Sequence, residues 1–109
     1  MTQDELNKQT VMTILQQMGG TGRLVAMTGA WNFLRGNEEN GNSYLTFRFK
    51  ASKKANYCKV TYCQGDDLYK VEFGKIRMPN YKKVSEHEGI YCDMLIELFE
   101  RETGLYLHF

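Results

Sequence analysis

The chain has 109 residues, of which 42% are apolar and 25% are charged, and this composition predicts a single globular domain over residues 1–109 rather than a disordered chain. No stretch approaches the roughly 18 consecutive apolar residues of a transmembrane helix, and the first residues lack the basic and apolar regions of a signal peptide, so we expect a cytoplasmic protein without a membrane contact. The formal net charge is only +1, but this small total hides two regions of opposite charge.

The first predicted element is a helix over residues 3–18. Thr2 and Glu5 have the spacing of a capping box, in which two side chains bind the free N–H groups of the first turn. The apolar residues that follow recur at intervals of three and four, which places them on one face of a helix. These residues are Leu6, Val11, Ile14, Leu15 and Met18. Two consecutive glycines are expected to end the helix.

Two short apolar runs come next, over residues 23–28 and 31–35, with a glycine between them. The simplest interpretation is two short strands joined by a turn. Trp31 and Phe33 are two residues apart, so we expect both side chains on the same face of the second strand. Residues 36–43 are glycine, asparagine, glutamate and serine, and this composition predicts a mobile polar loop.

The middle of the chain alternates between apolar and polar residues, as half-buried strands do. Strands are predicted over residues 44–50, 57–64 and 68–73, and a Gly-Asp-Asp turn joins the last two. The apolar side chains of each strand face the core, and the intervening polar side chains face solvent. Residues 75–84 contain the only proline and four basic residues, and we expect either an edge strand or an extended loop.

The last predicted element is a helix that begins near Ser85. Ser85 and Glu88 have capping-box spacing, and Gly104 is a typical C-terminal cap. Its apolar face comprises Tyr91, Met94, Leu95, Leu98 and Phe99. Each helix and strand has one apolar face to bury. The sequence therefore predicts an α+β fold, an antiparallel sheet of about four to five strands in meander order with the N-terminal and C-terminal helices packed on one face.

Charge divides the chain into two regions. Ten of the 14 basic residues lie between Arg48 and Lys83, where only three residues are acidic, so this region carries +7, whereas residues 84–109 carry −5. We expect the cations to gather on the open face of the sheet, opposite the acidic closing helix, and to bind an anionic partner. The candidate residues are Tyr44, Arg48, Lys50, Lys53, Lys54, Tyr57, Lys59, Lys70, Lys75, Arg77, Lys82 and Lys83.

No group of residues indicates catalysis, a cofactor or a metal site. The three cysteines lack the spacings of zinc sites, and Cys58 and Cys63 fall on opposite faces of their predicted strand, so we expect reduced thiols. The acidic and histidine side chains from Glu86 to Glu88 are better explained by the predicted helix cap than by acid–base chemistry. We therefore expect a protein that is not an enzyme and holds neither a metal nor a cofactor.

Five segments resemble a family of small, uncharacterised proteins encoded by bacteriophages and prophages. They are residues 27–33 (MTGAWNF), 52–57 (SKKANY), 69–77 (YKVEFGKIR), 89–95 (GIYCDML) and 102–107 (ETGLYL). The resemblance covers most of residues 13–107. It implies a small phage protein that works in the host cytoplasm, where stoichiometric binding and inhibition are commoner than catalysis, and it assigns no functional residue.

The leading hypothesis is a small non-enzymatic binding protein whose basic surface engages or inhibits a host macromolecule, such as a nucleic-acid-targeting defence complex. Direct binding of single-stranded nucleic acid is an alternative, since cations neutralise phosphates and aromatic rings stack on bases. Outward lysines can also serve only to keep a sheet soluble and prevent edge pairing.

Two further alternatives stay open. One is a nucleotide binder or enzyme with a pocket between the sheet and the helices, lined by Tyr62, Tyr69, Tyr91 and Cys92. The other is a homodimer, because Ile96 lies outside the apolar face of the last helix and the oppositely charged regions can pair two copies.

Overall fold

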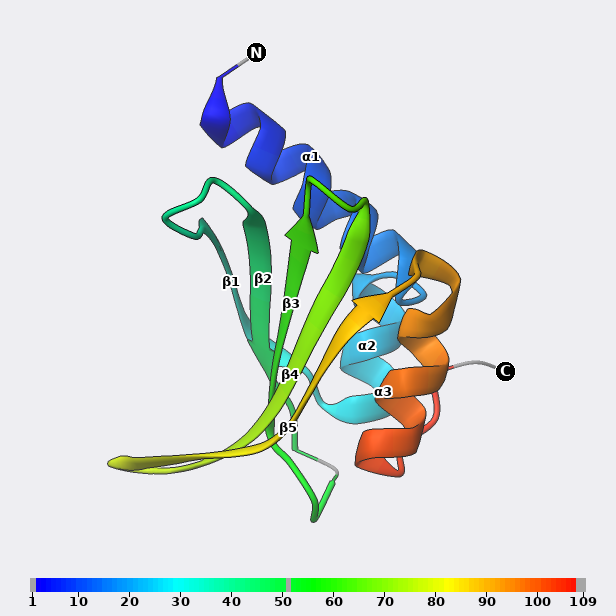
Figure 1. The fold of residues 1–109 in the computed structure, drawn as a ribbon. Helices are drawn as coiled ribbons and strands as arrows, with labels where there is room; N and C mark the ends of the chain where they lie inside the picture. The colour runs from blue at the N-terminus through cyan, green and yellow to red at the C-terminus, as the bar shows by residue number, and fades with distance from the viewer. Residues whose placement is uncertain (1, 51, 108–109) are drawn as a thin grey trace.

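The computed structural model describes residues 2–50 and 52–107, which form one sheet with helices packed against one of its faces (Figure 1). The strands are antiparallel and follow one another in chain order across the sheet. They are β1 (Trp31–Asn37), β2 (Ser43–Arg48), β3 (Tyr57–Cys63), β4 (Leu68–Arg77) and β5 (Asn80–Ile90). The helices are α1 (Gln3–Gln17), α2 (Thr21–Thr28), the 3₁₀ turn η1 (Cys92–Met94) and α3 (Leu95–Thr103). The predicted α+β class and meander are confirmed.

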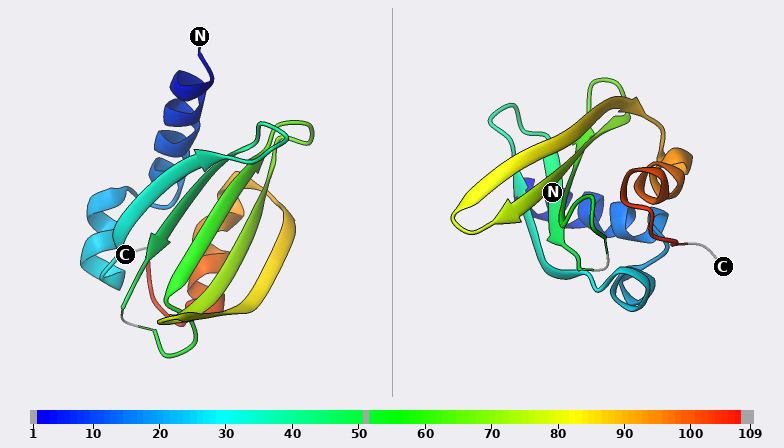
Figure 2. Two further views of the ribbon diagram at one scale, coloured as in Figure 1. Left: turned by 90° about the vertical axis from the view of Figure 1, so that its left-hand side faces the viewer. Right: turned by 90° about the horizontal axis from the view of Figure 1, so that it is seen from below.

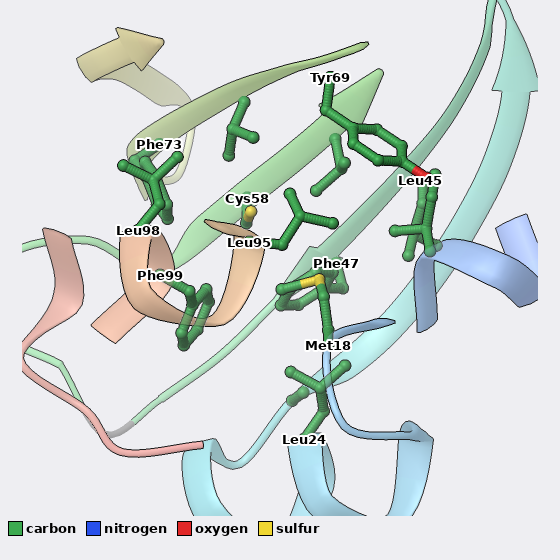
Figure 3. Packing of buried hydrophobic residues seen from close by; sticks show 14 of the residues in the cluster. Met18, Leu24, Leu45, Phe47, Cys58, Tyr69, Phe73, Leu95, Leu98 and Phe99 are labelled. Atoms are coloured by element: carbon green, nitrogen blue, oxygen red, sulfur yellow. The ribbon is translucent and has the colours of Figure 1, made fainter. Parts of the chain in front are cut away.

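The core lies between the sheet and the helices (Figure 3). Phe99 of α3 stands at its centre, with its ring centroid 5.2 Å from Phe49, 6.1 Å from Phe47 and 6.0 Å from Phe73. These four side chains are fully buried, as the alternation of the strands predicts. Leu95 and Leu98 add to the same face of α3, whereas Ile96 is partly buried at the edge of the core.

Helix α1 begins as predicted. The backbone N–H of Glu5 donates to the Thr2 hydroxyl oxygen at 3.2 Å, and the Thr2 hydroxyl donates to the Glu5 carboxylate at 3.1 Å. On the predicted apolar face Val11, Ile14 and Met18 are buried and Leu15 is partly buried, but Leu6 is 45% exposed. At this turn of the helix the buried residue is Asn7 instead. Its amide donates to the Gly36 carbonyl at 2.6 Å and so links α1 to β1.

Residues 23–28 belong to a helix, so the prediction of a strand there is wrong. Leu24 and Thr28, four residues apart, are both buried, while Val25 is 47% exposed, which is the burial pattern of a helix. Gly29 ends the helix with φ +70°, a left-handed conformation that glycine adopts without strain. A six-residue apolar run fits either element, and the packing of Leu24 into the core selects the helix here.

Trp31 and Phe33 lie on opposite faces of β1, contrary to the prediction. The pairing of β1 with β2 shifts between Trp31 and Leu34, and Asn32 within the shift has φ +56°. This β-bulge adds one residue to β1 and breaks the alternation of faces. As a result Phe33 stacks on the buried Phe47 at 5.5 Å, and Trp31 lies on the open face of the sheet.

The predicted polar loop over residues 36–43 is a tighter turn than expected, because β1 extends to Asn37 and β2 begins at Ser43. The backbone N–H of Glu38 donates to the Asn42 carbonyl at 2.8 Å and closes this turn. Residues 75–84, for which a strand or a loop was expected, form the hairpin between β4 and the edge strand β5.

Residues 85–90 are part of β5, so the predicted start of the last helix at Ser85 is wrong. Ser85, Glu86 and His87 pair with β4, and the helix begins only at Leu95. A serine and a glutamate three residues apart also fit a strand, and here the hydrogen bonds to β4 decide the conformation. Gly104 does end the helix as predicted, with its N–H donating to the Glu100 carbonyl at 2.8 Å.

Glu102 on α3 joins the helix to β5. Its Oε1 accepts a hydrogen bond from the Ser85 hydroxyl at 2.7 Å and lies 2.7 Å from His87 Nε2. The hydrogen bond from Ser85 lowers the pKa of Glu102, partial burial opposes this shift, and His87 lowers the pKa further.

We expect Glu102→Gln to lower the free energy of unfolding by about 1–2 kcal/mol at pH 7, because hydrogen bonds to a carboxylate are replaced by weaker ones. Since the folded-state pKa is below the usual value of about 4.3, this stability is present above that pH and is lost as the pH falls through the folded-state pKa. Urea unfolding at pH 7 and at pH 3 measures both effects. The exposed Glu97→Gln on the same helix is the control, and an unchanged difference between Glu102→Gln and wild type at pH 3 would contradict the assignment.

Candidate anion-binding surface

One row of paired residues crosses all five strands on the open face of the sheet. It is defined by the pairing of neighbouring strands, since directly paired residues point to the same face. The row consists of Trp31 on β1, Arg48 on β2, Tyr57 on β3, Gly74 on β4 and Lys83 on β5. Aromatic and basic side chains therefore alternate across the sheet, on the face that the helices leave uncovered.

Trp31 is held in this row by two cations. The guanidinium carbon of Arg48 lies 4.8 Å from the centroid of the indole ring, and Lys50 Nζ lies 5.6 Å from it. Both distances are in the range of cation–π interactions. The tryptophan is still 42% exposed, so it keeps a surface that can contact another molecule.

Tyr81 covers the gap that Gly74 leaves in the row. A Cβ atom at Gly74 would stand 2.2 Å from the Tyr81 hydroxyl oxygen, so only glycine fits beneath this ring. The Tyr81 ring meets Tyr57 edge to face at 5.4 Å, and its hydroxyl donates to Glu72 at 2.5 Å. Burial and this hydrogen bond raise the pKa of Tyr81. Tyr81 is 46% exposed and, like Trp31, presents a ring to solvent.

Three of the candidate lysines are neutralised within the chain. Lys59 Nζ lies 2.7 Å from Glu38 and above the Tyr44 ring, at 4.6 Å from its centroid. Burial is the largest single effect and lowers the pKa of Lys59, but the hydrogen bond and the charge of Glu38, together with Tyr57 and Glu72, raise it more, and the net shift of the pKa is upward. Lys70 and Lys83 both pair with Glu86, at 3.8 and 3.1 Å. The open face therefore carries carboxylates as well as cations.

The seven other candidate cations have no carboxylate within ion-pair distance among residues 2–50 and 52–107. We call these seven residues the basic end. They are Arg48, Lys50, Lys53, Lys54, Lys75, Arg77 and Lys82. No neighbouring anion balances their charge in the part of the chain that the structure covers.

Two hollows bring most of the basic end together. The first, of about 270 Å³, is lined by Trp31, Arg48, Lys50 and Lys75. The second, of about 370 Å³, is lined by Lys75, Arg77, Tyr81 and Lys82. Lys75 contributes to both hollows and so links them, at the edge where the open face meets the opposite face of the β4–β5 hairpin, from which Lys75 and Lys82 extend.

The backbone under the basic end is tied to the rest of the fold. Lys53 and Lys54 lie in the loop between β2 and β3, and Lys75 Nζ donates to the Lys53 carbonyl at 2.8 Å. The Asn56 side chain continues the sheet, because its Nδ2 donates to the Ile76 carbonyl at 2.9 Å and its Oδ1 accepts from the Ile76 N–H at 2.7 Å. These bonds hold the loop against the β4–β5 hairpin, whose tip projects away from the helices (Figures 1 and 2).

Acidic side chains gather at the other end of the strands. They lie in the β1–β2 turn, in the β3–β4 turn and in the first turn of α1 (Figure 1). These residues are Glu38 and Glu39, Asp66 and Asp67, and Asp4 and Glu5. The N–H of Gln64 donates to the Asn42 side chain at 3.3 Å and so joins the two turns.

Charge therefore separates along the strands, from the acidic turns to the basic end. The expected separation between the sheet and an acidic closing helix holds only in part. Asp93, Glu97, Glu100 and Glu102 lie in η1 and α3, but Glu86 and Glu88 belong to β5, within the sheet itself. Sequence reasoning also left Trp31 and Tyr81 out of the candidate surface. The face of Trp31 could not be predicted because the bulge at Asn32 breaks the alternation of β1. The face of Tyr81 could have been predicted from the alternation of residues along the β4–β5 hairpin.

The alternative pocket also has a counterpart in the structure. A hollow of about 350 Å³ beside α1 is lined by Tyr62, Tyr69 and Cys92, but not by Tyr91. Two of its polar groups are already paired, since the Tyr62 hydroxyl donates to Asp67 and the Tyr69 hydroxyl donates to Gln17 at 2.7 Å. Burial raises the pKa of Tyr69 to about 12. Hydroxyl, amide, carboxyl and thiol groups line this hollow, and they include no cation to bind a nucleotide phosphate.

Metal and membrane features were searched in the same described residues. No group of three or more histidine, cysteine or acidic side chains there is arranged to hold a metal ion. None of the helices in that part of the chain is both long and apolar enough to cross a bilayer. Cys58, Cys63 and Cys92 are free, and burial raises the pKa of the Cys58 thiol.

Comparison with protein-family models, with curated proteins and with solved structures finds no match.

Proposed function

We propose that this protein is a small non-enzymatic binding protein that engages an anionic macromolecule through its basic end. The observation that supports the proposal is the basic end itself, seven cations without a carboxylate at ion-pair distance in the described chain, five of which line the two hollows. Such a surface attracts polyanions, and binding gains free energy from the release of counterions. The acidic turns at the far end of the strands repel anions, and the basic end attracts them. The electrostatic field of the protein therefore leads an anion to the basic end first.

The resemblance to phage-encoded proteins supports a second part of the proposal, which concerns the cell in which the protein works. We propose that the protein works in the cytoplasm of the host cell and occupies a host macromolecule stoichiometrically. A complex that handles nucleic acid, such as a defence complex, offers the required anionic surface, either in its bound nucleic acid or in acidic protein.

Two triple variants with the same charge test the proposal. The first, the basic-end variant, replaces Lys50, Lys75 and Lys82 by glutamine. The second, the paired-lysine variant, replaces the three ion-paired residues Lys59, Lys70 and Lys83 by glutamine. Each lowers the formal net charge by three from +1, so they differ in location alone.

Affinity capture from host lysate, with and without nuclease, is the experiment. We expect wild type and the paired-lysine variant to recover the same partner, and the basic-end variant to recover none. Nuclease-sensitive recovery identifies nucleic acid, and nuclease-resistant recovery of one complex identifies a protein target. Equal recovery by the basic-end variant and wild type would contradict the proposal.

A further inference from the structure

We infer that the basic end binds single-stranded nucleic acid, with bases stacked on Trp31 and Tyr81 and phosphates contacting the surrounding cations. This inference rests on the proposed function and names the ligand of the same surface. It depends on how rings and cations are combined in the two hollows.

The first hollow combines an exposed ring with cations, because Trp31 stands there beside Arg48, Lys50 and Lys75. The second hollow is lined by Lys75, Arg77, Tyr81 and Lys82. Strand pairing places the Tyr81 ring on the open face, against Tyr57, whereas the three cations of this hollow extend from the opposite face of the β4–β5 hairpin. A ring for the base and cations for the phosphate are the two elements with which proteins hold an unpaired nucleotide, and the first hollow supplies both.

The sheet sets the spacing of these rings. Trp31 on β1 and Tyr57 on β3 lie two strands apart, with Arg48 between them. Neighbouring strands are about 4.8 Å apart, so the two side chains leave the sheet roughly 10 Å from each other. Tyr57 meets Tyr81 edge to face at 5.4 Å and so supports the second ring from below.

The exposed rings distinguish this ligand from other polyanions. An acidic protein surface requires the cations but offers no flat bases for Trp31 and Tyr81, which are 42% and 46% exposed. In a duplex the faces of the bases are stacked inside the helix, and only their edges are accessible in the grooves. An unpaired strand presents both phosphates and base faces, so it can contact the exposed rings as well as the cations.

Trp31 is the only tryptophan in the chain, so its fluorescence reports on this site directly. Three probes of equal length are titrated into the wild-type protein, namely a single-stranded pyrimidine oligonucleotide, the same strand without bases, and the duplex. We expect the oligonucleotide to quench the tryptophan and to bind about tenfold more tightly than the strand without bases, because stacking is lost in the latter. The duplex should bind more weakly than the single strand and without quenching.

Trp31→Ala tests the contact itself. It should weaken oligonucleotide binding about tenfold, measured by anisotropy of a labelled strand, and leave binding of the base-free strand unchanged. Leu34→Ala, another exposed apolar residue of β1, is the matched control and should change neither.

Equal affinity for the oligonucleotide and the base-free strand, with no quenching, would overturn this inference and leave the proposed function standing. Tighter binding of the duplex, or of an acidic protein alone, would overturn it as well. If none of the probes binds and no anionic partner is captured, both the inference and the proposed function are wrong.

Discussion

Replacing Lys50, Lys75 and Lys82 by glutamine should weaken binding of a single-stranded polyanion on the order of 100-fold at about 50 mM salt. The three side chains line the two hollows of the basic end, and Lys75 belongs to both. Each cation that contacts a phosphate releases counterions from the nucleic acid into dilute salt, which favours binding. The factors by which affinity falls when three such contacts are lost multiply one another. Fluorescence anisotropy of a labelled strand measures the change.

The dependence on salt provides a second readout of the same variant. If all seven cations of the basic end contact phosphates, the logarithm of the affinity should fall with the logarithm of salt concentration at a slope of roughly −5, and the basic-end variant should reduce the slope to roughly −3. The paired-lysine variant has the same net charge and should keep the wild-type slope, because its lysines are already neutralised by Glu38, Glu72 and Glu86. Equal losses in both variants would mean that net charge, and not the arrangement of the cations, controls binding.

Replacing Phe99 by alanine should have the largest effect on stability. The side chain is 1% exposed and contacts the rings of Phe47, Phe49 and Phe73. Removing a fully buried phenylalanine costs about 3–5 kcal/mol, since apolar burial is lost and a cavity remains. For a domain of this size the melting temperature should fall by roughly 15 °C or more.

Met12→Ala on α1 is the control for this substitution, because that side chain is 59% exposed and should change the melting temperature little. Calorimetry of the two variants and wild type makes the comparison. A fall of less than about 1 kcal/mol in Phe99→Ala would mean that α3 does not close the core in the way described.

The core strands were predictable because their pattern is local. Side chains alternate faces in every strand, so Leu45, Phe47 and Phe49 identify a buried face without knowledge of the partner strand. The N-terminal helix was equally predictable, since the hydrogen bonds between Thr2 and Glu5 need only the first turn. In both cases the deciding interactions lie within a few residues of one another.

The errors concern patterns that fit two conformations. The run from residue 23 to 28 fits a strand or a short helix, and packing of Leu24 into the core selects the helix. Ser85 and Glu88 fit a helix cap or a strand, and pairing with β4 selects the strand. In each case the deciding interactions involve residues far away in the chain. Local propensity does not include such interactions, so it cannot choose between the two conformations.

For the candidate surface, the amino-acid sequence alone established which residues carry positive charge and that they are concentrated between Arg48 and Lys83. Only the tertiary structure decided which of these charges remain available. Glu38 reaches Lys59 across a turn, and Glu86 reaches Lys70 from the next strand. The physical reason is that Coulomb attraction depends on distance in space, and folding sets that distance independently of separation along the chain. Folding also placed Trp31, through a single bulge, beside the cations that remained unpaired.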